Sequence, residues 1–97
     1  MNHRELKQHM RVWHPVFKWG TLYLPPLEEK SIVIFEFAQV IYTQPSTGKR
    51  VTHTWQDQGN MIYLDNRELF RTEQNMMDLP TDLKLKIAAM RPEIKLP

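Results

Sequence analysis

Three carboxylates are the residues of this chain best suited to acid–base chemistry: Asp57, Asp65 and Glu68 lie close together in the sequence. Two carboxylates held near each other can act as general acid and general base. Asp57 and Asp65, however, stand in segments rich in turn-forming residues, where short acidic side chains bond their own backbone. We therefore expect turns here, not a catalytic pair, and we expect no enzyme activity.

Metal and nucleophile chemistry lack the residues they need. The chain has no cysteine, which excludes thiolate ligands, disulfides and cysteine nucleophiles. Its four histidines have neither the HxH nor the HExxH spacing of a zinc site. The stretch 46–49 is similar to a phosphate loop but lacks the second glycine and a following helix. We expect partly exposed structural histidines, a hairpin turn, and neither a metal nor a cofactor.

Aromatic side chains are the stronger candidates for binding. Trp19 lies between Lys18 and Gly20, where a turn is expected and a large ring is hard to bury. Tryptophan is enriched at the hot spots of protein interfaces. We predict that Trp19 contacts a partner together with its neighbours; the alternative is that its ring folds back over the end of the fold. Trp13 and Trp55 fall inside predicted strands and are expected in the core.

Basic residues widen this candidate site. Arg11 and Lys18 would join the pair 49–50 in one basic patch if two predicted turns meet. Such a patch beside aromatic rings suits single-stranded nucleic acid, although a net charge of +2 is low for a dedicated duplex binder. The predicted partner-binding residues are Phe17, Lys18, Trp19, Lys49 and Arg50.

The first half of the chain is expected to form strands. Residues 12–17 form a strand in which Pro15 requires either an edge position or a bulge, and a turn follows at 18–20. Gly20 supplies either a positive φ or room for close backbone approach. The strongest strand signal is the β-branched and aromatic run 31–43, which is long enough to bend near Glu36 and join two halves of a barrel.

The rest of the sheet pattern is shorter. Residues 44–49 predict a hairpin loop with Gly48 in the left-handed conformation. An alternating strand over 51–56 follows, and then two short strands at 61–64 and 69–70.

Two short helices flank this sheet pattern. Asn2 caps a predicted helix that ends near Arg11. A second helix begins at Thr81 and ends before Pro92, because apolar residues recur there at helical spacing, although the alternation over 83–87 leaves a strand as the alternative. The apolar segment 73–97 docks on the chain's own sheet, pairs with a second copy, or folds onto a partner.

One motif resembles a known family. Val12-x-His14-Pro15-x-Phe17-x-x-Gly20-Thr21 is similar to the opening of small SH3-like or Tudor-like β-barrels of bacteria, such as the C-terminal module of UvrD-type helicases and the RNA-polymerase-interacting domain of CarD-type regulators. Residues 54–57 and 69–70 also resemble segments of short uncharacterised phage and prophage proteins. The resemblance covers residues 11–72, and Lys18 stands where the family has a glycine. It implies a protein-docking surface near the turn.

The sequence therefore predicts one domain over 1–97 that is mainly β (α+β): an SH3-like barrel of about five strands over 11–72, a short N-terminal helix and a C-terminal helical extension over 73–97. The resemblance implies a non-enzymatic protein-binding module of phage or bacterial origin that docks on or blocks a larger host machine, such as RNA polymerase, a helicase or a defence complex. The alternative is a nucleic-acid-binding accessory protein. No apolar run is long enough for a membrane span, which favours the cytoplasm.

Overall fold

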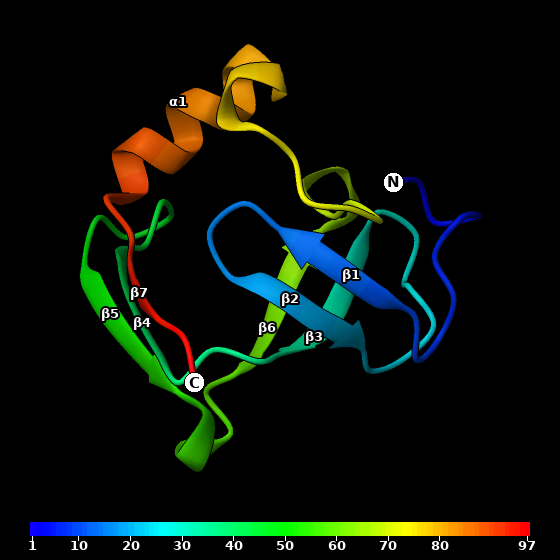
Figure 1. The fold of residues 1–97 in the computed structure, drawn as a ribbon, viewed down its shortest axis with the longest axis horizontal. Helices are drawn as coiled ribbons and strands as arrows, with labels where there is room; N and C mark the ends of the chain where they lie inside the picture. Colours follow the sequence, from blue (N-terminus) through cyan, green and yellow to red (C-terminus); the bar gives the residue numbers. More distant parts are fainter.

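The chain folds into two antiparallel sheets and one α-helix in the computed structural model, which describes residues 1–97 apart from the side chain of Asp57 (Figure 1). The first sheet has the strand order β1-β2-β3-β6, and the second has the order β5-β4-β7. The strands and the helix are β1 (Arg11–His14), β2 (Lys18–Leu22), β3 (Lys30–Phe35), β4 (Gln39–Thr43), β5 (Arg50–Thr54), β6 (Met61–Asp65), α1 (Thr81–Met90) and β7 (Glu93–Lys95).

The predicted mainly β fold with a helix is confirmed, but seven strands replace the expected five. The two sheets do not close into a barrel: no ladder joins β6 to the second sheet in the described part of the chain. In that same part, no helix is long and apolar enough to cross a bilayer.

The long strand predicted over 31–43 is shared between the two sheets, as the expected bend near Glu36 required. It runs as β3 in the first sheet, leaves the ladder at residues 36–38, and continues as β4 in the second. Burial falls on odd-numbered residues up to Phe37 and on even-numbered residues from Val40. This change of parity is what an extra residue in a strand produces, because each strand residue faces the side opposite to its neighbour.

The first hairpin turns earlier than predicted. Lys18, Trp19 and Gly20 belong to β2, and the turn takes residues 15–17 instead. The buried His14 ring explains the shift, because its Nδ1 accepts hydrogen bonds from the backbone N–H groups of Val16 (3.0 Å) and Phe17 (3.3 Å). The predicted turn at 18–20 is therefore wrong, although the sheet-edge position of the strand before Pro15 is confirmed.

Two features expected of a glycine, a positive φ and close backbone packing, fall on two different residues of β2. Lys18 adopts the left-handed φ of 68°, which falls at the position where the resembled family has glycine. Gly20 has no positive φ; it is needed for space, because a Cβ there would lie 2.7 Å from Val33 Cγ1 and 2.8 Å from the Ile34 carbonyl oxygen. Of the two roles considered for Gly20, close backbone approach is confirmed.

The N-terminal helix is not formed. The Asn2 side chain does accept the backbone N–H groups of Arg4 (3.0 Å) and Glu5 (3.1 Å), as a cap would. The chain makes only turns over residues 1–10, and His9 has a φ of 68° that no α-helix accommodates. A single turn of helix has too few hydrogen bonds to persist, so Leu6 reaches the core from a loop.

The second half of the sheet pattern is partly confirmed. Gly48 has the predicted left-handed φ, 71°, in the β4–β5 hairpin. The strand predicted over 51–56 stops at Thr54, where a 3₁₀ turn (Trp55–Asp57) begins, and Trp55 is 56% exposed instead of buried. Residues 69–70 form no strand; Phe70 makes a single bridge to Trp13, with N–H···O distances of 2.8 and 2.9 Å.

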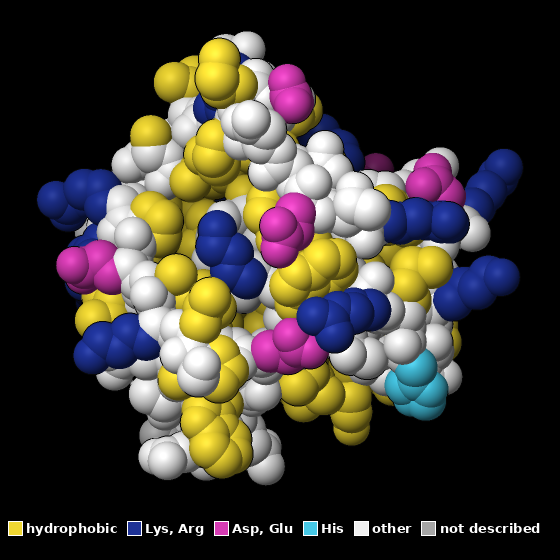
Figure 2. Space-filling model, viewed as in Figure 1, with side chains coloured by type: hydrophobic (Ala, Val, Ile, Leu, Met, Phe, Trp, Pro, Cys, Tyr) yellow, Lys and Arg dark blue, Asp and Glu magenta, His cyan; other side chains and the backbone are white. Residues whose placement is uncertain are grey.

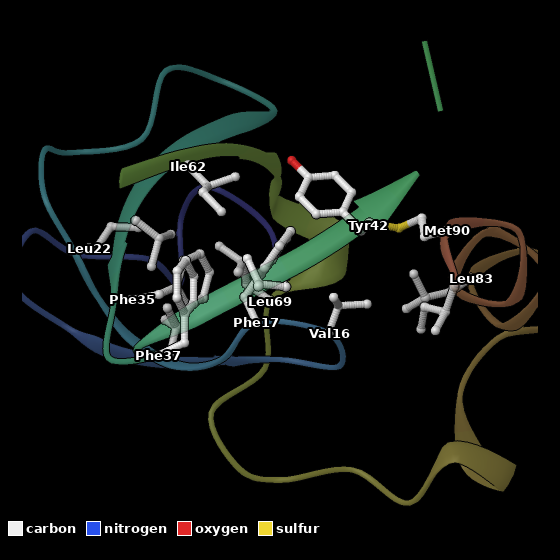
Figure 3. Packing of buried hydrophobic residues seen from close by; sticks show 14 of the residues in the cluster. Val16, Phe17, Leu22, Phe35, Phe37, Tyr42, Ile62, Leu69, Leu83 and Met90 are labelled. Atoms are coloured by element: carbon white, nitrogen blue, oxygen red, sulfur yellow. The ribbon is translucent and has the colours of Figure 1, made fainter. Parts of the chain in front are cut away.

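The C-terminal helix is confirmed, and it docks on the chain's own sheets. α1 buries Leu83, Ile87 and Met90, and Figure 3 shows Leu83 and Met90 beside Val16 and Tyr42 of the core. Pro80, not Thr81, occupies the N-cap position. The strand β7, which the sequence did not predict, follows Pro92 and pairs with β4.

Candidate functional site

Two tryptophans face each other across the first hairpin. The β1–β2 register sets Trp13 directly opposite Trp19, so both side chains leave the same face of the sheet. Trp13 is buried at 4% exposure, as predicted, and packs edge-on against Phe70 with ring centroids 6.2 Å apart. Trp19 is half-buried. The hairpin thus presents one covered and one accessible indole side by side.

These rings line a cleft of about 490 Å³ that we call the tryptophan cleft. Segments far apart in the sequence build it, since the chain's last residues lie beside the hairpin (Figure 1). Figure 2 shows hydrophobic side chains around a hollow on this face, with charged side chains of both signs among them. The lining residues are Trp13, Lys18, Trp19, Glu36, Phe37, Glu73, Gln74, Leu96 and Pro97.

The Trp19 ring is held in place by charged neighbours. The Arg11 guanidinium lies 4.6 Å from the ring centroid, and its Nη2 is 3.4 Å from Glu36 Oε2. The indole Nε1 donates to Glu73 Oε1 at 3.2 Å. A cation over the face and an acceptor at the edge are the two electrostatic contacts that an indole offers. The accessible indole is therefore orientated before any partner arrives.

The charges around the cleft are balanced. Lys18 Nζ lies 5.6 Å from the Trp13 centroid and donates to the Pro15 carbonyl at 3.1 Å. With Arg11 it supplies two cations, which Glu36 and Glu73 match with two carboxylates. The cleft is thus an apolar hollow in a rim without excess charge.

The predicted site residues separate into three places. Lys18 and Trp19 line the tryptophan cleft. Phe17 is 1% exposed and belongs to the core, so its side chain offers no contact surface. Lys49 is exposed on the β4–β5 hairpin, and Arg50 bonds the Met90 and Arg91 carbonyls (3.2 and 2.9 Å) at the end of α1. Arg50 thus stabilises a helix terminus, as a cation at that end does.

The candidate carboxylates are held by their own partners. Asp65 accepts the Arg67 backbone N–H at 2.9 Å and pairs with its guanidinium at 3.1 Å, which lowers the pKa of Asp65. The Asp57 side chain lies outside the described residues. Among the residues that are described, no group of three histidine, aspartate or glutamate side chains could hold a metal ion.

Glu68, the third candidate carboxylate, belongs to a buried polar network with His14 and Lys86. Because His14 Nδ1 accepts two backbone N–H groups, its Nε2 carries the proton and donates to Glu68 Oε1 at 3.0 Å. Glu68 Oε2 accepts from Lys86 Nζ at 2.9 Å. His14 is fully buried, and neither ring nitrogen remains for a metal or a substrate. The sequence identified both residues separately but carried no signal that they meet.

The protonation states follow from these contacts. Burial lowers the pKa of His14, and the Glu68 carboxylate opposes that shift without cancelling it. Burial alone would raise the pKa of Glu68, but the hydrogen bonds from His14 and Lys86 bring it below its ordinary value. At neutral pH the network therefore holds a neutral imidazole and a paired carboxylate.

We predict that stability falls as the pH drops from 7.5 to 5.5. The unfolded chain takes up a proton at His14 near its ordinary pKa of 6.5, whereas the folded chain resists that proton until the pH is lower. The contribution of His14 to the free energy of unfolding is therefore complete above about pH 6.5 and falls below it, by at most about 1.4 kcal/mol per pH unit, and the lowered pKa of His53 adds to the fall in the same direction. Urea unfolding at several pH values measures this slope; a flat or rising free energy would contradict the assignment.

The comparisons with known proteins found no relative: the chain matches no protein-family model, no curated protein and no solved structure.

Proposed function

We propose that this chain is a non-enzymatic protein-docking module, which binds one segment of a larger protein in the tryptophan cleft. The proposal includes a phage or bacterial origin and a host machine in the cytoplasm, such as RNA polymerase, a helicase or a defence complex, as the target. It also includes descent from an SH3-like barrel, which the bent segment β3–β4 supports because it runs through both sheets.

The observation that carries this proposal is an apolar cleft beside the Trp19 indole, whose orientation is fixed by its neighbours. Phe37 and Trp13 line the cleft with largely apolar ring surface, and Leu96, 61% exposed, also lines it. A hollow of about 490 Å³ accommodates an aliphatic or aromatic side chain. Because Trp19 is already held by Arg11 and Glu73, binding loses little side-chain entropy. The expected occupant is an apolar anchor residue on a loop or strand of the partner.

Charge distinguishes this proposal from nucleic-acid binding. Binding to phosphates needs cations in excess, whereas the rim pairs Lys18 and Arg11 with Glu36 and Glu73. The other two predicted cations lie at the β4–β5 hairpin, and Arg50 is committed to the end of α1. The rim thus favours a protein partner whose binding depends weakly on salt.

The test is a pull-down from bacterial lysate with nuclease, read by mass spectrometry, on three variants. Trp19→Ala should reduce recovery of the partner at least about tenfold, the loss typical of an interface hot spot. Trp55→Ala, which removes an exposed indole on another element, is the matched control and should recover the partner fully. Leu96→Ser should also weaken recovery, since it alters the cleft from an exposed position.

Three results would overturn the proposal. Recovery that disappears with nuclease would favour the nucleic-acid alternative. Equal recovery by wild type, Trp19→Ala and Leu96→Ser would remove the cleft from the interface. Loss with Trp55→Ala alone would move the interface to the β5–β6 connection. Circular dichroism of each variant shows whether a loss of recovery reflects unfolding.

A further inference from the structure

On the side of the first sheet that faces away from the core, the part formed by β3 and β6 is apolar and exposed. In the β3–β6 register, Ile32 lies opposite Tyr63 and Ile34 lies opposite Met61. Tyr23 extends the first row, because its backbone N–H donates to the Ile32 carbonyl at 2.9 Å. These five side chains leave the side of the sheet opposite to the core residues of β3. We call this surface the outer face.

The exposure of its side chains is large. Tyr63 is 55% exposed, Tyr23 44% and Met61 40%, and the loop after β2 adds Leu24 (43%) and Leu27 (67%). Together they amount to several hundred Å² of apolar surface, on the order of the largest patch on a typical monomer. Between the loop and β6 lies a hollow of about 310 Å³, lined by Leu24, Pro25, Pro26, Leu27, Lys30, Ser31, Ile32 and Tyr63.

The strand composition indicates that something covers this face. β3 is apolar on both sides: Val33 and Phe35 enter the core while Ile32 and Ile34 point outward. Strands that are apolar on both faces are typical of sheets covered on both sides, whereas a solvated face carries polar residues. In the described structure the core side of β3 packs in the buried core, whereas on the outer side Tyr23, Met61 and Tyr63 stay 44%, 40% and 55% exposed.

The charges around the outer face suit a second copy of the same surface. Lys30 and Asp65 stand opposite each other at one end of the β3–β6 ladder, and Lys30 Nζ lies 5.3 Å from the Tyr63 centroid. The pair Arg11 and Glu36 stands at the other end. Each end thus carries both signs, so an identical surface can meet it without like-charge repulsion in either orientation.

We propose that two copies of this chain pack through their outer faces, sheet against sheet, around a two-fold axis. Two such patches bury on the order of 1,000 Å² together, the lower limit for a specific interface, so the expected dimer is a weak one. The dimer predicted through residues 73–97 stays a prediction: Leu83, Ile87 and Met90 of that segment are buried in their own chain, whereas Met77 and Leu85 are exposed. The dimer surface ends at the pair Arg11 and Glu36, which also stands at the tryptophan cleft, but it needs no partner bound in that cleft.

Sedimentation equilibrium of the full chain over a concentration series tests it. We expect a monomer–dimer equilibrium with a dissociation constant on the order of 10 µM. Tyr63→Glu should weaken it at least about tenfold, because the substitution puts a charge in place of an apolar ring on the surface that the dimer buries. Leu85→Glu is the matched control: Leu85 is 67% exposed on α1, and its substitution should leave the dimer unchanged.

A second measurement uses only the wild-type chain, so it tests the dimer even if the Tyr63→Glu variant unfolds. Amide NMR shifts of the wild-type chain, recorded on dilution, should change at residues 21–34 and 61–65 and not on α1. A wild-type chain that stays monomeric at about 500 µM, far above the expected constant, would overturn the proposal. So would a dimer that survives Tyr63→Glu, or shifts that change elsewhere. None of these three results decides whether a partner binds in the tryptophan cleft.

Discussion

Replacing Phe17 with alanine should lower the free energy of unfolding by about 4 kcal/mol. The ring is 1% exposed and lies at the centre of the core, between the two sheets (Figure 3). Its centroid is 4.7 Å from that of His14 and 5.2 Å from that of Phe35, and Phe37 and Tyr42 are also in contact. Alanine would leave a cavity that these rigid rings cannot fill. Urea unfolding at pH 7.5 measures the loss.

The conservative variant Phe17→Leu is the control for this prediction. It keeps most of the apolar volume, and we expect a loss below about 1.5 kcal/mol. A Phe17→Ala chain with nearly wild-type stability but no partner recovery would contradict the core assignment. It would instead place Phe17 on the docking surface, as the sequence predicted.

Replacing Glu68 with alanine should cost about 3 kcal/mol. The change leaves the His14 Nε2–H buried without an acceptor, since the ring has no other partner on that side. It also removes the carboxylate that holds Lys86 against the body of the fold. The loss is measured by urea unfolding at pH 7.5, where the imidazole is neutral.

Lys86→Ala is the matched control within the same network. The Lys86 side chain is 43% exposed, so water replaces much of its pairing with Glu68. We expect a loss below about 1 kcal/mol, as for other ion pairs that are partly in solvent. Equal losses in the two variants would show that the ion pair, and not the buried histidine contact, makes the larger contribution.

Several elements could be predicted because their signal is local. The β-branched run 31–43 is long and apolar on both faces, and its bend coincides with the single acidic residue inside it, Glu36. Gly48 sits in a loop of turn-forming residues, where the left-handed conformation costs glycine little. α1 shows helical spacing in three residues that the core buries.

Other elements depended on contacts between distant residues. The first turn is set by hydrogen bonds to the His14 ring, and Lys18 adopts a conformation that its residue type does not suggest. β7 has only three residues, and it forms because the end of α1 places them beside β4, with which they pair. Trp55 follows the alternation of β5, but the chain leaves the sheet one residue before it.

The candidate site was predicted only in part for the same reason. Lys18 and Trp19 are neighbours in the chain, so one motif identified both. The opposite wall comes from Glu73 and Leu96, which the fold brings to the hairpin from far along the sequence. Nearness in the sequence groups Phe17 with Trp19. In a chain that turns at 15–17, however, the Phe17 ring enters the core and the Trp19 ring lines the cleft.

Site-specific photo-crosslinking from the tryptophan cleft tests the central claim most directly. A photo-reactive benzophenone amino acid replaces Gln74, which lines the cleft, or Leu85 on the exposed side of α1. After irradiation in nuclease-treated bacterial lysate, we predict that the Gln74 variant forms a covalent adduct with one protein and that Leu85 does not. The adduct should disappear when Trp19→Ala is added. Adducts of equal yield from both positions, or a Gln74 adduct that persists with Trp19→Ala, would contradict docking through this cleft.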